Sequence, residues 1–302
     1  MSEISEQRQG ARAKVGVDER RPVFVGDIQG CIDELEALLT HLEKCWGHDG
    51  FVLYAVGDLI NRGPGNLAVL ERLRALVEAK QATVVLGNHE LHFLMVALGL
   101  RVLGERDTLA DVIDSSECAD WVDWIRRRPV AISDVLYGHP FVMVHASLHP
   151  NWDLDFVSAQ ASRIGNELGG SDLEITHRFL AQDPKIVEPD SNRDLLDRIL
   201  SCRSVQGDNW SSAPPEKGWL PWHEAWSQNG HNYGIVYGHW AVQGLHVAGG
   251  LRGLDTGCVH HARTGEGCLT AWVPEPLSQE GDFQDPFSVP DGAFVQIPAN
   301  SH

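Results

Sequence analysis

The sequence has no long apolar run. Nowhere in its 302 residues is there a stretch near the roughly 20 apolar residues that a membrane-spanning helix needs. The opening residues, MSEISEQRQGARAKVGVDER, also lack the apolar segment of a signal peptide. We therefore expect a cytoplasmic protein with no membrane partner.

The sequence also lacks paired cysteines. Six cysteines lie far apart, at positions 31, 45, 118, 202, 258 and 268, with no C-x-x-C motif. This spacing indicates neither a zinc cage nor a disulfide framework. Reduced thiols in a cytoplasm fit it best.

Basic residues are few. The chain has 24 Lys and Arg against 42 Asp and Glu, which gives a formal net charge of -18. A field of this sign repels DNA, RNA and anionic lipids, so we expect no DNA partner. A phosphate-bearing substrate would have to be bound locally, by a metal ion or an arginine.

The chain is 43% hydrophobic, which is enough for one large α/β domain with a buried sheet. Short apolar runs alternate with helical patterns, as in a layered α/β fold. We predict strands at 22–25, 51–56, 82–86, 141–144, 235–237 and 269–273, and helices at 31–46, 66–80, 90–99 and 117–127.

The composition divides the chain into a domain and two tails. Residues 1–20 are polar and residues 275–302 are rich in Pro, Gly and acids, so both are predicted to be tails around a domain at 21–274. Residues 156–232 do not follow the rhythm of the rest. They form either a surface insertion or a cap that shapes the substrate pocket.

A side chain that can bind a metal follows each of five predicted strands. These side chains are Asp27, Asp58, Asn88, His145 and His239. They should meet, because ligands of α/β sheets bind at the carboxyl ends of the strands. A glycine directly precedes four of these five donors and lets the backbone turn tightly out of the strand.

This set of donors suits metals of the first transition row. Two carboxylates, one amide oxygen and two imidazoles favour a pair of divalent ions such as Mn(II), Fe(II) or Zn(II). Calcium fits less well. A carboxylate shared by both ions would give a two-metal site that acts at phosphorus, and we expect Asp58 to be that bridge.

The motifs resemble a known family. GDIQG at 26–30, GDLINRG at 57–63, GNHE at 87–90, His145-Ala146 and Gly238-His239-Trp240 resemble the signature blocks of the PPP-type, calcineurin-like metallophosphoesterases. The longer strings GDIQGCIDEL, GDLINRGPGNL, LGNHELHFL, HASLHPNWDL and LDTGC resemble the symmetrical bis(5'-nucleosyl)-tetraphosphatases, the diadenosine tetraphosphate hydrolases. The resemblance covers about residues 22–155 and 234–273. It implies a four-layer αββα sandwich, two Mn(II)-like ions and hydrolysis of diadenosine tetraphosphate to two ADP.

The resemblance also implies roles for single residues. One ion would be held by Asp27, Gln29 and Asp58, and the other by Asp58, Asn88, His145 and His239. Metal-bound hydroxide would attack phosphorus. Arg62 would bind a phosphate oxygen beside Asn88, and His89 would protonate the leaving oxygen.

Two positions depart from the PPP pattern. Position 29 is Gln where these enzymes generally carry His, and its amide oxygen is a weaker ligand, so activity would need added Mn(II). Position 61 is Asn where phosphoprotein phosphatases place Asp. An amide can hold the tautomer of His89 but stabilises imidazolium less, which favours the tetraphosphatase branch.

Residues 156–232 do not match the family pattern. Arg193, Arg198 and Arg203 are the candidates there for contacts with substrate, and Arg203 is our choice. Asp255 either supports a metal ligand or is a turn residue. Adenine would stack on Trp219, Trp222 or Trp240.

Our interpretation is a hydrolase of nucleoside polyphosphates, with RNA 5' ends that carry such groups as a further partner, in a monomer or weak oligomer. Two alternatives stay open. One is a serine/threonine phosphoprotein phosphatase of the PPP type. The other is a non-catalytic metal-binding module in which Gln29 marks a decayed site.

Overall fold

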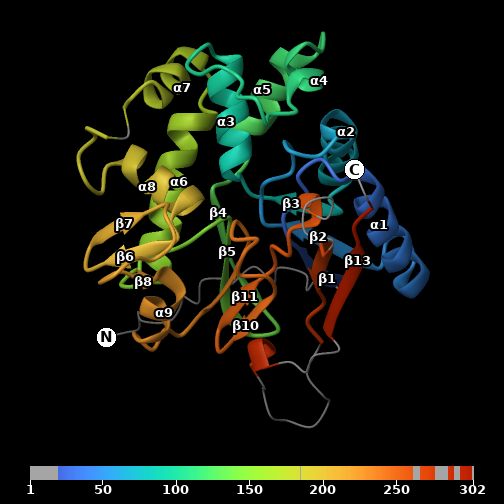
Figure 1. The fold of residues 1–302 in the computed structure, drawn as a ribbon. Helices are drawn as coiled ribbons and strands as arrows, with labels where there is room; N and C mark the ends of the chain where they lie inside the picture. The colour runs from blue at the N-terminus through green and yellow to red at the C-terminus, as the bar shows by residue number, and fades with distance from the viewer. Residues whose placement is uncertain (1–19, 184, 261–265, 276–284, 289–292, 301–302) are drawn as a thin grey trace, which may run out of the picture.

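Two five-stranded sheets pack against each other in the centre of the protein (Figure 1). The computed structural model describes residues 20–183, 185–260, 266–275, 285–288 and 293–300. The first sheet has the order β13-β12-β1-β2-β3. Its strands are β13 (Phe294–Pro298), β12 (Cys268–Trp272), β1 (Arg21–Val25), β2 (Phe51–Ala55) and β3 (Ala82–Val84). The last three run parallel, so their carboxyl ends lie at one edge of the sheet.

The second sheet supplies the other side of that edge. Its order is β10-β11-β9-β5-β4. The strands are β10 (His246–Ala248), β11 (Leu251–Gly253), β9 (Gly234–Tyr237), β5 (His139–Val144) and β4 (Ala131–Leu136). Strands β5 and β9 are parallel, which brings their carboxyl ends together as well.

A compact apolar layer joins the two sheets. It contains Phe24 of β1, Trp272 of β12, Met143 of β5 and Val236 of β9, all fully buried. The rings of Phe24 and Phe141 meet edge to face across the interface, with centroids 5.3 Å apart. Burial of these large side chains removes much apolar surface from water and so stabilises the packing of one sheet on the other.

Helices cover the outer faces. On the first sheet, α1 (Ile32–Trp46) packs on β12 and β13, and α2 (Asn66–Glu78) packs on β3. On the second sheet, α6 (Leu154–Gly169) packs on β4. The buried leucines of α1, at 35, 38, 39 and 42, recur at helical spacing and explain why this segment lies on the sheet. The predicted αββα order of layers is confirmed.

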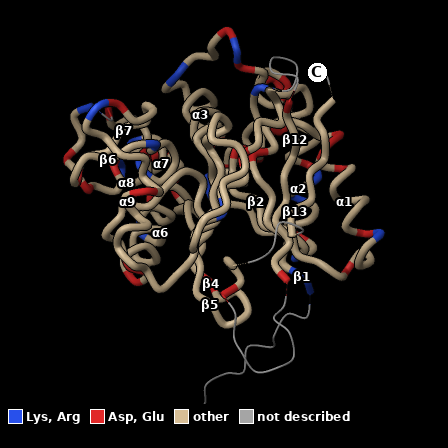
Figure 2. Tube along the Cα trace, turned by 60° about the horizontal axis from the view of Figure 1, so that its bottom comes forward, with Lys and Arg blue, Asp and Glu red and all other residues tan. Residues whose placement is uncertain are grey.

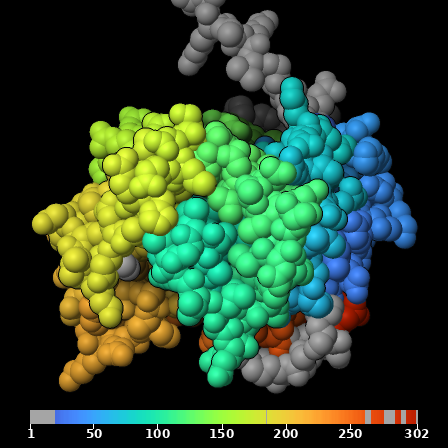
Figure 3. Space-filling model, turned by 90° about the horizontal axis from the view of Figure 1, so that it is seen from above, coloured from blue at the N-terminus to red at the C-terminus, as the bar shows by residue number. Residues whose placement is uncertain are grey.

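Further short helices connect β3 of the first sheet to β4 of the second. They are α3 (Asn88–Ala97), α4 (Ala110–Ile113) and α5 (Cys118–Arg126). The segment 156–232 forms the rest of α6, α7 (Leu173–Leu180), α8 (Asn192–Ser201), β6 (Ser204–Gln206), β7 (Asn209–Ser211), β8 (Leu220–Pro221) and α9 (Trp222–Ser227). From above, the yellow part of this insertion lies beside the cyan and green segment that holds α3 and α5 (Figure 3).

The prediction of a C-terminal tail is wrong for part of the segment 275–302. Residues Phe294–Pro298 form β13, which pairs with β12 and makes the edge of the first sheet. Phe287 is 3% exposed in the layer between the sheets. Neighbouring Pro and Gly concealed this short strand in the composition. The predicted tail at 1–20 lies outside the described residues, apart from Arg20.

Within the described ranges, no helix combines the length and apolar character required to cross a bilayer.

Candidate dinuclear metal centre

The structure brings the strand-end donors together between the two sheets. Carboxylate and imidazole ligand atoms of Asp58, His145 and His239 all lie within 4.8 Å of one another. The amide oxygen of Asn88 is 3.0 Å from Nε2 of His145 and 2.7 Å from Nδ1 of His239. Four potential ligands from four separate segments thus surround one point.

Glycines permit this close approach. A Cβ at Gly238 would collide with Oδ1 of Asp27, and a Cβ at Gly87 would collide with Asp58. Both glycines directly precede a donor residue, so the repeated pattern of glycine and donor has a steric reason. The backbone of one block leaves room for the side chain of another.

Asp27 and Gln29 lie beside these donors. The amide nitrogen of Gln29 lies 3.4 Å from Oδ2 of Asp58, and the Asp27 carboxylate accepts from the backbone N–H of His239 at 3.1 Å. Gln29 adopts φ 49°, in the left-handed region, and is 7% exposed. Oδ2 of Asp58 thus faces Gln29, while its Oδ1 lies 3.3 Å from Nε2 of His145, an arrangement that suits a bridging ligand.

Buried negative charge accumulates around these donors. Asp27, Asp58, Glu90 and Asp255 are each 4% exposed or less. Burial, with the charges of Asp255 and Asp58, raises the pKa of Asp27, and burial raises the pKa of Asp255 to about 6 and that of Glu90 to about 7. Carboxylates gathered in this way need a compensating charge, and divalent cations supply it. The residues present therefore fit a metal centre.

The two histidines that could bind metal differ in their surroundings. Burial opposes protonation of His145, but Asp58 outweighs it and raises its pKa. Burial, with His145 and Arg203, lowers the pKa of His239 well below its ordinary value. Nδ1 of His145 lies 3.0 Å from the backbone oxygen of Val56, which leaves Nε2 as the atom that faces Asn88 and Asp58.

Asn61 fixes the orientation of His89. Its Oδ1 accepts from the backbone N–H groups of Arg62 and Thr108, at 2.9 and 3.0 Å. Its Nδ2 must therefore be the group that lies 2.9 Å from Nδ1 of His89. Nδ1 accepts, so the ring carries its hydrogen on Nε2, which lies 3.5 Å from Oδ2 of Asp58. Burial also lowers the pKa of His89, which favours this neutral form.

Asp107 is a residue of the site that the sequence does not reveal. Its Oδ1 accepts from Nδ2 of Asn61 and NH1 of Arg62, both at 2.9 Å. Its Oδ2 accepts from the backbone N–H of Gly104 at 2.7 Å and lies 2.8 Å from Nε2 of His92. Asp107 follows no strand and stands in no repeated motif, so no pattern in the sequence points to it.

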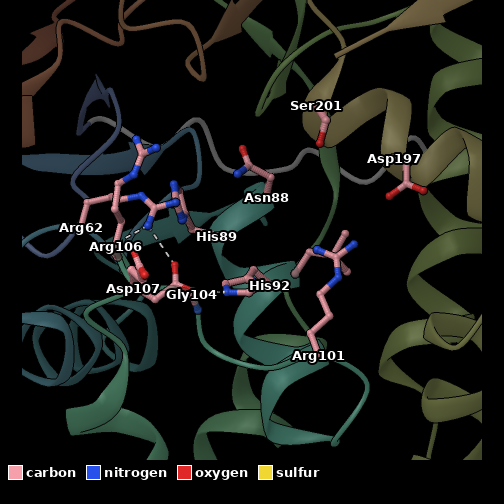
Figure 4. A pocket seen from close by; sticks show the side chains of 12 residues that line it. Arg62, Asn88, His89, His92, Arg101, Gly104, Arg106, Asp107, Asp197 and Ser201 are labelled. Atoms are coloured by element: carbon pink, nitrogen blue, oxygen red, sulfur yellow. Dashed lines mark hydrogen bonds and ion pairs between the residues drawn. The ribbon is translucent and has the colours of Figure 1, made fainter. Parts of the chain in front are cut away.

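Two cavities open from this centre, and Arg62, Asn88 and His89 line both. The larger, of about 700 Å³, lies between α3, α8 and the loop after α3 (Figure 4). The smaller, of about 270 Å³, also borders Asp58, Gln29 and His239. The catalytic candidates therefore stand at the junction of two spaces.

The insertion contributes one of its three candidate arginines to the smaller cavity. Arg203 lines it and donates from NH2 to the backbone oxygen of His239 at 3.2 Å. Arg193 is buried against Asp197, and Arg198 donates to the backbone oxygen of Asp208. Trp240 and Asp255 also line the smaller cavity.

Trp222 stands apart from the cavities. It is 1% exposed and packs edge to face on Tyr237 in the core.

Comparison with known proteins gives this fold and site a class. Residues 20–263 match the calcineurin-like phosphoesterase family. The chain therefore belongs to the calcineurin-like phosphoesterases, and membership implies divalent metal ions. Within that class it belongs to the symmetrical bis(5'-nucleosyl)-tetraphosphatase family, which confirms the predicted resemblance.

Two curated relatives carry this assignment. A symmetrical bis(5'-nucleosyl)-tetraphosphatase of Ralstonia nicotianae is 35% identical over 250 residues, 79% of this chain and 85% of that protein. Another, of Burkholderia mallei, is 34% identical over 252 residues, 79% of this chain and 86% of that protein.

Solved structures share the fold. A candidate diadenosine tetraphosphatase aligns with a TM-score of 0.58 at 24% identity over 94% of this chain and 96% of its own. A serine/threonine phosphatase from Saccharomyces cerevisiae aligns with a TM-score of 0.56 at 14% identity, over 95% of this chain and 82% of its own. At these identities the likeness is one of fold alone.

Proposed function

We propose that this protein hydrolyses diadenosine tetraphosphate and related nucleoside polyphosphates symmetrically, to two ADP. The observation that carries the proposal is the position of Arg62, Asn88 and His89 at the junction of the two cavities. A polyphosphate that extends into both cavities presents its middle to these residues. The curated relatives, which are named for this activity, support the substrate.

Two divalent ions fit the donors. Asp27, Gln29 and Asp58 would hold one, and Asp58, Asn88, His145 and His239 the other. When bound, the ions acidify water and neutralise charge on the phosphoryl group. We propose Mn(II), because mixed oxygen and imidazole donors suit it, with Fe, Zn or Co as alternatives.

The remaining residues orient the substrate. NH1 of Arg62 is held by Asp107 and by the backbone oxygen of Arg106, at 2.9 and 2.8 Å, and we propose that its guanidinium binds a phosphoryl oxygen. His89 is placed to donate a hydrogen bond from Nε2 to the leaving oxygen, and Asn61 keeps the hydrogen on that atom. Arg203 and Asn88 would contact substrate from the smaller cavity.

Three further properties are proposed. RNA 5' ends that carry a nucleoside tetraphosphate present the same group and are a further substrate class. The second proposed property is a monomer or weak oligomer. All six cysteines are free, which supports a cytoplasmic location.

The test is to incubate the Mn(II)-loaded protein with diadenosine tetraphosphate and to identify the nucleotides by chromatography, with a phosphopeptide as a parallel substrate. ADP as the single product is the expected result. ATP with AMP would contradict symmetrical cleavage. An intact dinucleotide with release of phosphate from the peptide would favour the phosphoprotein phosphatase.

Asp58→Asn is the matched negative control for this assay. It keeps the shape of the side chain but removes the bridging charge, so turnover should fall by more than about 10²-fold. A purified protein that retains divalent metal after Mn(II) loading but cleaves neither substrate would favour the non-catalytic metal-binding module.

A further inference from the structure

We propose that the larger cavity, here called the distal cavity, binds the phosphates farthest from the attacked phosphorus, and that Arg101 and Arg106 are their ligands. This inference rests on the proposed function and adds a subsite to it. The distal cavity is bounded by Arg62, Asn88, His89 and His92 on one side and by Asp197 and Ser201 of α8 on the other. The loop from Arg101 to Asp107 forms its rim.

The distal cavity continues directly from the catalytic residues. Its inner end is made by Asn88 and His89, at the start of α3, and by Arg62. In Figure 4, Arg62 and Arg106 lie together beside His89, while Arg101 extends into the space near His92 and faces Asp197. Its volume of about 700 Å³ is in the usual range for pockets that bury a ligand of this size, roughly 300–1,000 Å³.

Its charge is unusual for this protein, whose formal net charge is -18. Acidic and basic positions alternate along the loop after α3 (Figure 2). Two of the three acids that line the cavity are already paired. Asp107 binds Arg62 and His92, and Asp197 lies 2.5 Å from NH1 of Arg193. This leaves Arg101 and Arg106 against Glu105, which is a net positive rim.

Arg106 is coupled to the catalytic arginine. Its backbone oxygen accepts from NH1 of Arg62 at 2.8 Å, and the next residue, Asp107, accepts from the same nitrogen. Thr108 continues the attachment, since its hydroxyl donates to the backbone oxygen of Gly63 at 2.8 Å. The loop is thus tied to the segment that bears Arg62, so a phosphate bound at its rim is held at a constant distance from the reacting one.

The smaller cavity has a different lining. Beside Arg203 and the metal ligands it presents Trp240, Ala241, Val242 and Pro214. An aromatic face and apolar walls suit a nucleoside base, whereas arginines suit phosphate oxygens. The distal cavity, with no Trp, Tyr or Phe among its lining residues, is therefore the one for the phosphate chain.

The test compares the double variant Arg101→Gln/Arg106→Gln with the wild type. Tripolyphosphate and orthophosphate are used as competitive inhibitors of p-nitrophenyl phosphate hydrolysis at a constant excess of Mn(II). We expect the ratio of the two inhibition constants, tripolyphosphate over orthophosphate, to rise about tenfold or more, because only the longer anion reaches the rim. The KM for diadenosine tetraphosphate should rise by a similar factor, with a smaller change in kcat.

Arg163→Gln is the matched control, because Arg163 is an exposed arginine on α6 and does not line the distal cavity. It should leave the ratio unchanged, which excludes a general effect of removing an arginine. An unchanged ratio in the double variant would overturn the subsite.

The two proposals fail in different ways. If the wild type does not cleave the dinucleotide but the ratio still shifts in the double variant, the substrate is wrong and the subsite stands. If the dinucleotide is cleaved and the double variant keeps both the ratio and the KM, the subsite is wrong and the function stands.

Discussion

Nδ2 of Asn61 lies 2.9 Å from Nδ1 of His89 and donates to it. The same nitrogen donates to Oδ1 of Asp107 at 2.9 Å, so an amide stands between the ring and a carboxylate. A carboxylate in direct contact would favour the imidazolium form, whereas the amide leaves Nδ1 as an acceptor in a neutral ring. Asn at position 61, where phosphoprotein phosphatases carry Asp, therefore favours neutral His89 over the imidazolium form.

Asn61→Asp should raise the pKa of His89. A carboxylate would then face Nδ1 and stabilise a proton there, against the burial that lowers this pKa in the wild type. NMR titration of the protein labelled with ¹⁵N-histidine measures the change, with exposed His41 of α1 as internal reference. An unchanged His89 titration would show that Asn61 does not control the ring.

Asp107→Ala should lower kcat/KM by about tenfold to hundredfold. The change releases Arg62, Asn61 and His92 from a shared anchor, so Arg62 and His89 are no longer held in position. Steady-state kinetics with diadenosine tetraphosphate measures the loss. Asp120→Asn, at an exposed position of α5, is the control and should behave as wild type. Equal rates in both variants would contradict the anchoring role.

Gln29→His should lower the Mn(II) concentration needed for half-maximal activity. An imidazole is a better ligand than an amide oxygen, and position 29 already faces Asp58. Gln29→Ala should shift the midpoint to higher Mn(II). Activation curves for the three proteins give the comparison. If all three curves coincide, residue 29 does not bind the first ion.

Gly238→Ala should remove metal and activity together. The new Cβ would collide with Oδ1 of Asp27 and displace that carboxylate. The metal content of the purified protein, measured by mass spectrometry, is the readout. Gly165→Ala is the control, because a Cβ there meets nothing within 4 Å and lies in helix α6. Full metal content in Gly238→Ala would contradict the placement of Asp27 at the site.

His223, which is not among the candidate metal ligands, should make the fold sensitive to acid. Burial, with the charge of neighbouring His246, lowers the pKa of His223 to about 4. Between that value and the ordinary 6.5 the unfolded chain binds a proton that the folded chain does not. Stability is therefore complete above that window and decreases as the pH falls through it.

His223→Gln removes this contribution and should reduce the pH dependence of the free energy of unfolding. Glutamine can still bond to Gln243, the present partner of the ring. Urea denaturation at several pH values between 4 and 7 measures the free energy of unfolding. The control is His41→Gln, at an exposed position. A variant whose stability changes with pH as steeply as that of the wild type would contradict the assignment.

Strands and helices of the first half could be predicted closely because their signals are local. The predicted helix at 31–46 and strand at 51–56 differ by one residue from α1 and β2. The strand Phe294–Pro298 was not predicted, because it forms by pairing with β12, a contact that the local sequence does not show. An edge strand this short has no clear pattern of its own.

The sequence by itself determined the donors at the strand ends, because a strand, a tight turn and a polar side chain are consecutive in the chain. Tertiary structure alone decided what surrounds them. Asp107 meets Asn61 across 46 positions, and Asn88 meets His239 across 151. The distal cavity likewise exists only where α3, α8 and the loop after α3 come together. Contacts at such separations depend on how the sheets and helices pack, which no local pattern encodes.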